Sequence, residues 1–399
     1  MATLGIRNIG QVVSGLLDQP ILEADTLLVS DGHIAAVGGP EILESVDVDT
    51  LIDANGTTLL PGLIDSHVHP TAGDFTPRQL VLDFIESSLH GGVTSMISAG
   101  EAHFPGRPKD PVGVKALATL IHASFENARP AGVKVHGGAL ILEPGLTEAD
   151  FAELQKAGVW LVGEVGLGKV YKPEEARPMV EWAHKYGFKV LMHCGGTSIP
   201  GSSVVTADDV AGVGPDVVCH LNGGPTATSP TDIRRIVRET PFALELVQCG
   251  NQQAALVALE EIRSRGEIER LILGNDAPSG TGVIPLGMLR NIAFLASVGD
   301  LDAAEAVACA TGNTARVFAL NTGAIVEGRE ADLILADAPM GSAGHTALEA
   351  LKCGDLPGIS MVLIDGVVKV KVSRNTPPPA RKTVARRRGV EGSWQSTMV

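Results

Sequence analysis

Residues 61–70 read Pro-Gly-Leu-Ile-Asp-Ser-His-Val-His-Pro, an apolar run that ends in two histidines separated by one residue. Side chains two residues apart on a β-strand point to the same face, so the imidazoles of His67 and His69 can reach one point. A strand end can present two nitrogen ligands to a metal in this way. Such a pair also occurs as ordinary hydrogen-bonded surface histidines, so the rest of the chain has to decide between the two interpretations.

The composition indicates a globular protein with a large core, because 44% of the 399 residues are hydrophobic and 19% are charged. A formal net charge of -15, with no basic aromatic groove, argues against a nucleic-acid partner. Residues 1–7 do not resemble a signal peptide, and no apolar run is long enough to span a membrane. Five cysteines without a Cys-x-x-Cys pair favour neither a disulfide framework nor a thiolate zinc site, so we expect a cytoplasmic protein.

Both ends of the chain are predicted to form short strands and tight turns. Asp31-Gly32 lies between two apolar runs, which is a hairpin signal. The strands predicted at the two ends are 26–30, 33–37, 331–336 and 361–370. We predict that residues 1–60 and 321–376 form one β-sandwich domain.

The last residues, 377–399, are rich in proline and then in arginine. This composition is typical of a disordered tail, which is our prediction. The alternative is a membrane or partner contact made by the arginines.

The centre of the chain, residues 61–320, alternates apolar β-rich runs with helical segments. Counting the run before His67, there are eight, and the other seven are 92–97, 132–139, 159–162, 188–192, 216–219, 242–247 and 271–273. Eight strands alternating with helices predict an α/β fold of the (β/α)8 TIM barrel type. A doubly wound open sheet is the alternative, but the chain lacks the glycine-rich phosphate turn and the P-loop that such sheets usually carry.

Polar residues follow five of the eight predicted strands. A (β/α)8 barrel gathers the carboxyl ends of its strands at one rim, where its function lies. The residues that meet there are His67, His69, Glu164, His193, His220 and Asp276. Imidazole and carboxylate ligands suit two nearby divalent ions such as zinc. Singly, each residue could instead be a salt-bridge partner or a satisfied core histidine.

In these residues the chain resembles the amidohydrolase superfamily of metal-dependent hydrolases. The superfamily pattern has His-x-His after strand one, a bridging ligand after strand four, histidines after strands five and six, and an aspartate after strand eight. Segments 31–34 and 61–65 also resemble the β domain of the family and the start of its barrel. One departure is that many two-metal members bridge their ions with a carboxylated lysine, where this chain has Glu164. Lys169 and Lys172 come late, outside the predicted strand, and stay open as alternatives to Glu164. Some members with glutamate here use one metal.

Loop segments resemble the enamidase branch of this superfamily more specifically, and they are 91–100, 103–110, 128–139 and 274–282. That resemblance implies hydrolysis of a carboxylated lactam, 6-oxo-1,4,5,6-tetrahydronicotinate, to 2-formylglutarate and ammonia in nicotinate degradation. It also implies zinc, with iron as a second metal, and a homotetramer. A metal-bound hydroxide would attack the lactam carbonyl, and Asp276 would act as general base and then acid.

The substrate implied by the resemblance needs partners for its carboxylate and its ring amide. Arg78, Arg107 and Lys169 are candidates for the carboxylate, although solvated surface side chains are the simpler interpretation of these residues. Asn222, Gln248, Ser279 and Thr281 stand near predicted strand ends and are candidates for the amide. We predict that Cys194 and Cys219 are packing residues, because strand alternation turns them away from the adjacent metal histidines.

Two other functions stay open at this point. One is another cyclic-amide hydrolase or deaminase of the superfamily, such as a dihydroorotase-like, hydantoinase-like or imidazolonepropionase-like enzyme. The other is a non-catalytic hydantoinase-like scaffold, which would usually have lost ligands that this chain retains.

Overall fold

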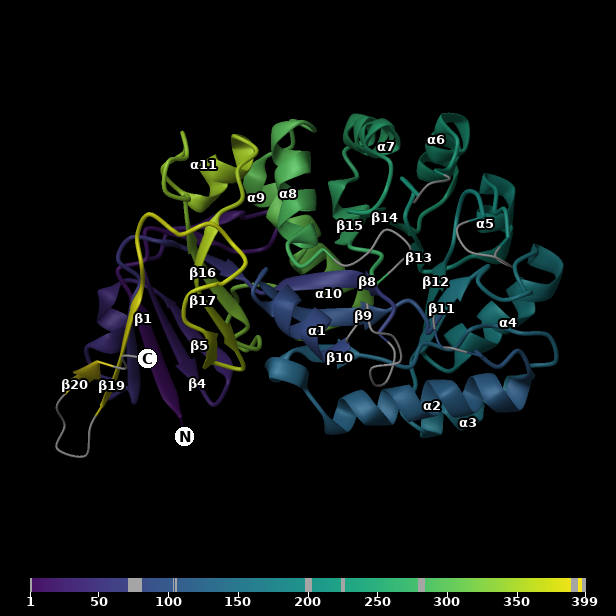
Figure 1. Ribbon diagram of the computed structural model, residues 1–399, viewed down its shortest axis with the longest axis horizontal. Coiled ribbons are helices and arrows are strands. Elements are labelled where there is room, and N and C mark those ends of the chain that lie inside the picture. The colour runs from purple at the N-terminus through teal and green to yellow at the C-terminus, as the bar shows by residue number, and fades with distance from the viewer. Residues whose placement is uncertain are drawn as a thin grey trace. The chain divides into compact units, whose positions relative to one another are not determined.

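The computed structural model describes residues 2–70, 81–102, 104, 106–197, 203–223, 227–278, 284–388 and 394–396. The chain forms two compact units (Figure 1). The β unit comprises Met1–Ile64, Ser87–Thr94 and Met288–Val399. The barrel unit comprises Asp65–Glu86 and Ser95–Gly287. The predicted domain boundaries at residues 61 and 320 stay a prediction. The two compact units divide the chain at other positions, and residues 288–320 belong to the β unit.

The β unit contains two six-stranded sheets that combine strands from both ends of the chain. The first has the order β20-β19-β6-β1-β4-β5. Its strands are β1 (Thr3–Arg7), β4 (Thr26–Ser30), β5 (His33–Gly38), β6 (Thr50–Asp53), β19 (Val384–Arg388) and β20 (Trp394–Ser396). The second has the order β18-β17-β16-β7-β2-β3. Its strands are β2 (Gln11–Val13), β3 (Ile21–Leu22), β7 (Thr58–Pro61), β16 (Leu333–Asp337), β17 (Gly358–Ile364) and β18 (Val367–Val370).

One apolar core joins the two sheets into a sandwich. Ile6 and Leu27 from the first sheet belong to the same buried cluster as Leu335 and Leu363 from the second. The predicted hairpin between β4 and β5 is confirmed, with φ of 46° at Asp31 and 81° at Gly32. Left-handed values at both central residues match the right-handed twist of the strands they connect.

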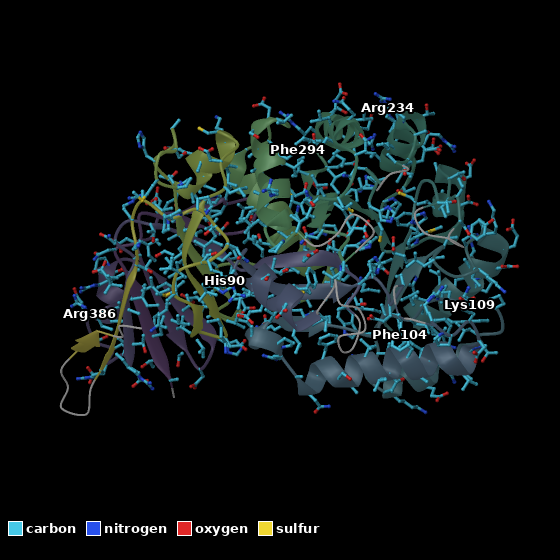
Figure 2. All side chains as sticks on the ribbon, viewed as in Figure 1. His90, Phe104, Lys109, Arg234, Phe294 and Arg386 are labelled. Atoms are coloured by element: carbon cyan, nitrogen blue, oxygen red, sulfur yellow. The ribbon has the colours of Figure 1, made fainter. Side chains whose placement is uncertain are left out.

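The prediction of a disordered tail over 377–399 is wrong for Val384–Arg388. This segment forms β19, which pairs antiparallel with β6. Arg381 anchors it, because its guanidinium makes hydrogen bonds of 2.9 and 2.6 Å to the two oxygens of buried Asp337. Arg386 points outward from this sheet (Figure 2) and is exposed. Composition alone therefore missed a strand whose arginines stay in solvent while its backbone completes a sheet.

Eight of the strands in the described residues form the barrel, and all eight predicted strands are confirmed. They are β8 (Leu63–Val68), β9 (Val93–Ser98), β10 (Lys134–His136), β11 (Leu161–Val165), β12 (Lys189–Met192), β13 (Val217–Val218), β14 (Ala243–Val247) and β15 (Leu271–Gly274). They pair as the sheets β10-β9-β8 and β11-β12-β13-β14-β15. Parallel bridges from Val68 to Ala277 and from Leu140 to Val162 join these sheets at both seams. The fold is therefore a (β/α)8 barrel, whose strand ends meet at one rim.

Helices alternate with the barrel strands, and Figure 1 shows α4 to α7 on the outer side of β11 to β15. The α-helices are α1 (Val81–Leu89), α2 (Pro111–Asn127), α3 (Glu148–Lys156), α4 (Pro173–Lys185), α5 (Ala207–Val213), α6 (Pro230–Glu239), α7 (Gln252–Arg265), α8 (Gly287–Ser297), α9 (Ala303–Cys309), α10 (Gly312–Phe318) and α11 (Ala347–Lys352). Short 3-10 turns occur at Pro40–Leu43, Pro130–Gly132 and Ile268–Arg270. Helix starts are well capped: Asn251 accepts a hydrogen bond from the Ala254 N–H at the start of α7. Within the described segments, no helix combines the length and apolarity needed to cross a bilayer.

Candidate metal centre

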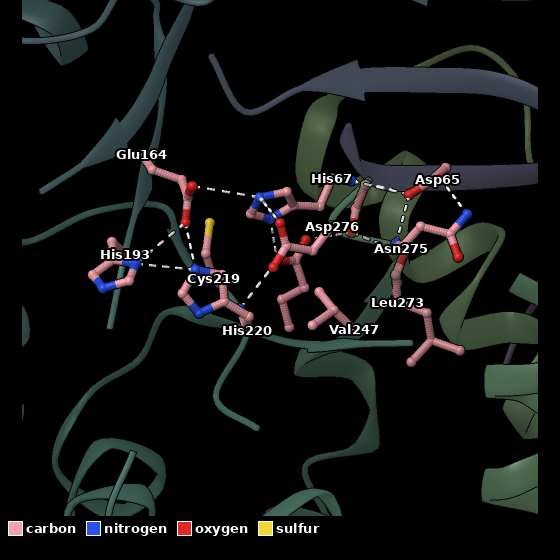
Figure 3. A network of polar contacts seen from close by, with 12 residues as sticks. Asp65, His67, Glu164, His193, Cys219, His220, Val247, Leu273, Asn275 and Asp276 are labelled. Atoms are coloured by element: carbon pink, nitrogen blue, oxygen red, sulfur yellow. Dashed lines mark hydrogen bonds and ion pairs between the residues drawn. The ribbon is translucent and has the colours of Figure 1, made fainter. Parts of the chain in front are cut away.

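Four side chains from three places on the barrel rim form a first donor set. His67 Nε2 and His69 Nε2, at the end of β8, lie 3.3 Å apart. Glu164 Oε2, on β11, lies 3.5 Å from His67 Nε2 and 3.8 Å from His69 Nε2. Asp276 Oδ1, just after β15, lies 3.6 and 3.4 Å from the same two nitrogens. Figure 3 shows His67, Glu164 and Asp276 pointing toward one another.

A second donor set shares Glu164 with the first. Its other oxygen, Oε1, lies 2.6 Å from His220 Nε2 and 3.8 Å from His193 Nδ1. The two imidazole nitrogens are 3.1 Å apart. The Glu164 carboxylate thus presents one oxygen to each pair of histidines, as a ligand that bridges two ions would.

The spacing of the first set fits a coordinated ion. Ligands at about 2.1 Å from zinc in a tetrahedral arrangement lie about 3.4 Å from one another. The first set spans 3.3–3.8 Å and contains two imidazoles and two carboxylates. Imidazole and carboxylate groups at these distances are the donors expected of a zinc-type site. The side chains present therefore fit a metal ion at this position.

Hydrogen bonds on the far side of three histidines fix which ring nitrogen faces the centre. His67 Nδ1 lies 2.7 Å from Glu245 Oε2, and His69 Nδ1 lies 2.7 Å from the Gly100 carbonyl. His193 Nε2 lies 2.9 Å from the Gly196 carbonyl. Each of these oxygens can only accept, so the imidazole nitrogen beside it carries the proton. The other nitrogen of each ring faces the centre, where it can coordinate an ion once it carries no proton, as metal-ligating histidines require.

Asp65 forms hydrogen bonds with His67 and with Asn275, the residue that precedes Asp276. It accepts hydrogen bonds from the His67 N–H at 3.2 Å, the Asn275 N–H at 2.9 Å and the Asn275 side-chain amide at 2.7 Å. Asp65 is fully buried, and burial raises its pKa to about 7. Asp276, the next residue after Asn275, has a φ of 56°. This left-handed backbone is uncommon outside glycine and turns the chain sharply at the end of β15.

Electrostatics keep the two carboxylates of the donor sets, Glu164 and Asp276, ionised. Burial raises the pKa of Glu164, but His67 and His220 outweigh burial and hold it well below its ordinary value. Burial also raises the pKa of Asp276, but nearby histidines, His67 most of all, outweigh burial and lower this pKa below its ordinary value. Both groups are therefore in the charge state that binds a cation.

The structure places the residues predicted to bind substrate in different surroundings. The Arg107 guanidinium lies 3.4 Å from Glu143 Oε1 and donates to the Leu167 carbonyl at 3.2 Å, so it links three loops at the rim. Lys169 is exposed, and Gln248 is half-buried with its N–H bonded to Gly274. Asn222 is buried, and its side chain exchanges two hydrogen bonds with the Val247 backbone, so its amide is already engaged. Arg78, Ser279 and Thr281 lie outside the described residues.

The two cysteines that precede or follow candidate ligand histidines, Cys194 after His193 and Cys219 before His220, have different surroundings. Cys194 is buried, and its thiol donates to the Cys219 carbonyl at 3.0 Å, which fits a packing residue. The prediction that Cys219 turns away from the histidines is wrong, because its Sγ lies within 4.8 Å of donor atoms of His67 and Glu245. Alternation fails here because β13 ends at Val218 and His220 has a φ of 33°.

Glu245, Ser66 and Asn275 are site residues that the sequence analysis missed. Glu245 stands in the middle of β14, between buried Leu244 and Leu246. A charged side chain inside a fully buried strand needs a partner. The glutamate within this apolar run was therefore the feature of the sequence that could have indicated a site residue. The sequence pattern did not say which partner it would find.

Comparison with known proteins identifies close and distant relatives. The chain is 60% identical over 376 residues to enamidase from Eubacterium barkeri, which covers 94% of this chain and 97% of that protein. It is 27% identical to adenine deaminase from Deinococcus deserti, over 82% of this chain and 55% of that protein. A crystal structure of enamidase superposes with a TM-score of 0.93 at 59% identity, covering 96% of this chain and 99% of that one.

A family model agrees with these relatives. The model of the amidohydrolase family matches residues 218–369, which include His220, Glu245 and Asp276. High identity over nearly the whole length of the Eubacterium enzyme extends this match to the rest of the chain. The chain therefore belongs to the amidohydrolase family.

Proposed function

We propose that this chain is an enamidase, which hydrolyses 6-oxo-1,4,5,6-tetrahydronicotinate to 2-formylglutarate and ammonia. The observation that carries the proposal is the 60% identity to Eubacterium barkeri enamidase over 97% of that protein. Dihydroorotases and adenine deaminases are far more distant, at 27% identity for Deinococcus deserti adenine deaminase and Brevibacillus brevis dihydroorotase. The chain is thus a hydrolase of a carbon–nitrogen bond in a cyclic amide.

We further propose that the two donor sets hold two divalent ions, zinc in both or zinc with iron. His67, His69 and Asp276 would serve one ion, His193 and His220 the other, and Glu164 both. The support is that each Glu164 oxygen faces a different histidine pair, at 2.6–3.8 Å. When bound, such ions would activate a shared water as nucleophile and polarise the lactam carbonyl.

Asp276 is the proposed proton carrier of the reaction. Its side chain is 17% exposed, more than that of any other carboxylate or imidazole in the ion-pair network of the first donor set. It would take the proton of the attacking water and deliver it to the ring nitrogen as the carbon–nitrogen bond breaks. Ring opening leaves an enamine, whose imine tautomer adds water and releases ammonia, so the aldehyde forms without an oxidant.

The substrate carboxylate is proposed to bind Arg107. Its side chain is 11% exposed, and its contacts with Glu143 and the Leu167 carbonyl hold it in place at the rim. An arginine held in advance loses little side-chain freedom when it binds a carboxylate. Arg78, Lys169, Gln248, Ser279 and Thr281 stay further candidates for substrate contacts, and Asn222 would act by positioning the end of β14.

We also propose a cytoplasmic homotetramer. The support is the close likeness to the enamidase branch and the acidic, cysteine-poor composition. Size-exclusion chromatography with light scattering would measure the assembly directly.

The test of the function is a metal analysis of the purified protein coupled to an assay with the lactam. We expect about two metal equivalents per chain and release of ammonia together with an aldehyde. Dihydroorotate, hydantoin and adenine serve as competing substrates. Preference for any of these over the tetrahydro-oxonicotinate lactam would overturn the assignment, and metal-free inactive protein would favour a scaffold.

A further inference from the structure

Glu245 is the one carboxylate in the described centre that contacts histidines of both donor sets without belonging to either. It lies on β14 and is completely buried. Its Oε2 lies 2.7 Å from His67 Nδ1 and accepts from the His220 backbone N–H at 3.1 Å. Its Oε1 accepts from the Ser66 hydroxyl at 2.5 Å. Three donors from two other strand ends thus converge on one side chain.

The contact with His67 decides how that histidine meets a metal. A carboxylate oxygen can only accept, so it keeps the proton on His67 Nδ1. Nε2, which lies 3.5 Å from Glu164 Oε2 and 3.6 Å from Asp276 Oδ1, is then the nitrogen available to bind an ion. A negative partner behind a ligating imidazole also raises the basicity of the ring.

The contact with His220 acts on the backbone. His220 has a φ of 33°, a left-handed conformation that costs energy for a residue with a side chain. The hydrogen bond from its N–H to Glu245 and that from Leu221 N–H to the Glu245 carbonyl, at 2.9 Å, hold this turn. The turn carries His220 Nε2 to within 2.6 Å of Glu164 Oε1.

We propose that Glu245 is a positioning residue that couples the two metal positions, orienting His67 for one ion and the His220 turn for the other. Because it is completely buried behind His67 and the His220 turn, it would act on the reaction through these residues. The inference rests on the proposed metal centre. It also adds a third negative charge to those of Glu164 and Asp276, which favours two divalent cations over one in this buried site.

The test compares Glu245→Gln with Glu261→Gln, a matched change on α7, where Glu261 pairs with Arg238 at 2.7 Å outside the centre. The glutamine can preserve the packing. Its carbonyl can face His67 and His220 while its amide donates to Ser66, whose own proton can turn to the Leu273 carbonyl 2.8 Å away. The substitution therefore removes chiefly the charge.

Metal binding is measured by equilibrium dialysis in zinc buffered by a chelator, and cobalt-substituted protein is followed by its visible absorption. Wild type and Glu261→Gln should bind two equivalents. Glu245→Gln should bind both ions about 10- to 100-fold more weakly and change the cobalt spectrum. A purely structural role would instead lower the melting temperature equally with and without metal and leave both affinities unchanged, which would overturn the proposal.

Two further outcomes keep the test decisive. If wild type itself binds no metal, the proposed function fails and this inference fails with it, whereas normal binding by both wild type and Glu245→Gln removes the positioning role alone. If Glu245→Gln does not fold by circular dichroism, Ser66→Ala removes only one of the three donors. We expect roughly a threefold to tenfold loss of zinc affinity from that change, as for one hydrogen bond, and unchanged affinity would overturn the proposal.

Discussion

Asp276 combines a strained backbone with an ionised side chain. Its φ of 56° turns the chain at the end of β15, and its Oδ1 reaches the two histidines of β8 at 3.6 and 3.4 Å. The Cys249 thiol lies 3.3 Å from its other oxygen, Oδ2. One carboxylate oxygen therefore faces the two histidines, and the other accepts a hydrogen bond from a thiol, which suits a group proposed to take and give a proton.

Asp276→Asn should keep bound metal but lower kcat by about 10²- to 10⁴-fold, because an amide oxygen can still coordinate but cannot accept the proton of the attacking water. Steady-state kinetics with the lactam and metal analysis of the same preparation measure both effects. Asp232→Asn, on the first turn of α6, is the control. Turnover close to that of wild type would remove Asp276 from its catalytic role.

Glu164→Gln tests the bridge. An amide presents one acceptor oxygen instead of two, so we expect one metal equivalent per chain where wild type has two, with a loss of kcat of at least about 100-fold. Metal content after gel filtration is the measurement, and Glu175→Gln on α4 is the control. Two retained equivalents with normal kcat would show that Glu164 does not bridge.

Arg107→Ala should raise KM for the carboxylated lactam by about 10- to 100-fold while kcat changes little, because the arginine contributes to substrate binding and takes no part in proton transfer. Exposed Arg129, after α2, supplies the control Arg129→Ala. A methyl ester of the substrate should bind wild type and Arg107→Ala about equally. An unchanged KM for the free acid would point to Arg78 or another contact.

At the scale of elements, the strands were predictable and the turns that end them were not. Eight apolar runs predicted β8 to β15 because buried parallel strands have a continuous hydrophobic pattern. The six donors followed from the rule that strand ends share one rim. Glu245 was missed because its partners come from two other strands, and Cys219 was misplaced because the chain leaves strand geometry at His220. The strand β19 was missed because it depends on the open edge of β6, far away in sequence.

Asp216 links elements on the outside of the barrel and gives a prediction about pH. It accepts hydrogen bonds from His184 Nε2 at 2.9 Å, Val190 N–H at 2.8 Å and Lys189 Nζ at 3.0 Å, which join α4, β12 and the start of β13. Burial raises the pKa of Asp216, but these bonds outweigh burial and lower it below its ordinary value. The stabilising contribution is therefore present above the pKa of the unfolded state and lost as the pH falls through the folded pKa.

Asp216→Asn should reduce the free energy of unfolding by about 1–2 kcal/mol at pH 7, since charge-assisted hydrogen bonds are weakened. The difference from wild type should shrink as the pH falls below about 4, because the carboxyl then takes up a proton in the unfolded state first, and it should vanish once the pH lies below the lowered pKa of the folded state. Urea denaturation at several pH values measures both quantities. A difference that stays constant down to pH 3 would contradict the assigned role of the charge.

At the scale of the whole molecule, the six proposed metal donors lie in one of the two units. All six belong to the barrel unit, Asp65–Glu86 with Ser95–Gly287, and the sandwich core belongs to the β unit. The donors come from the ends of β8, β11, β12, β13 and β15, so bound ions would tie strands from both barrel sheets together. Metal binding should therefore stabilise one unit directly and leave the core of the other with its own apolar packing.

Removing metal with a chelator should lower the melting temperature of the protein. It should also increase the hydrogen exchange of the barrel unit before that of the β unit. Metal at 100 times its dissociation constant stabilises a folded protein by about 2.7 kcal/mol, and that contribution disappears with the ion. Repulsion between the ionised carboxylates of Glu164 and Asp276 would then act without the ions that offset it. Hydrogen exchange read by mass spectrometry should show faster exchange in peptides from 161–165, 189–192 and 271–274, while peptides from β1, β4 and β17 keep their protection. Adding zinc back should restore the slow exchange, and equal loss of protection in both units would show that the chain unfolds as a single cooperative unit.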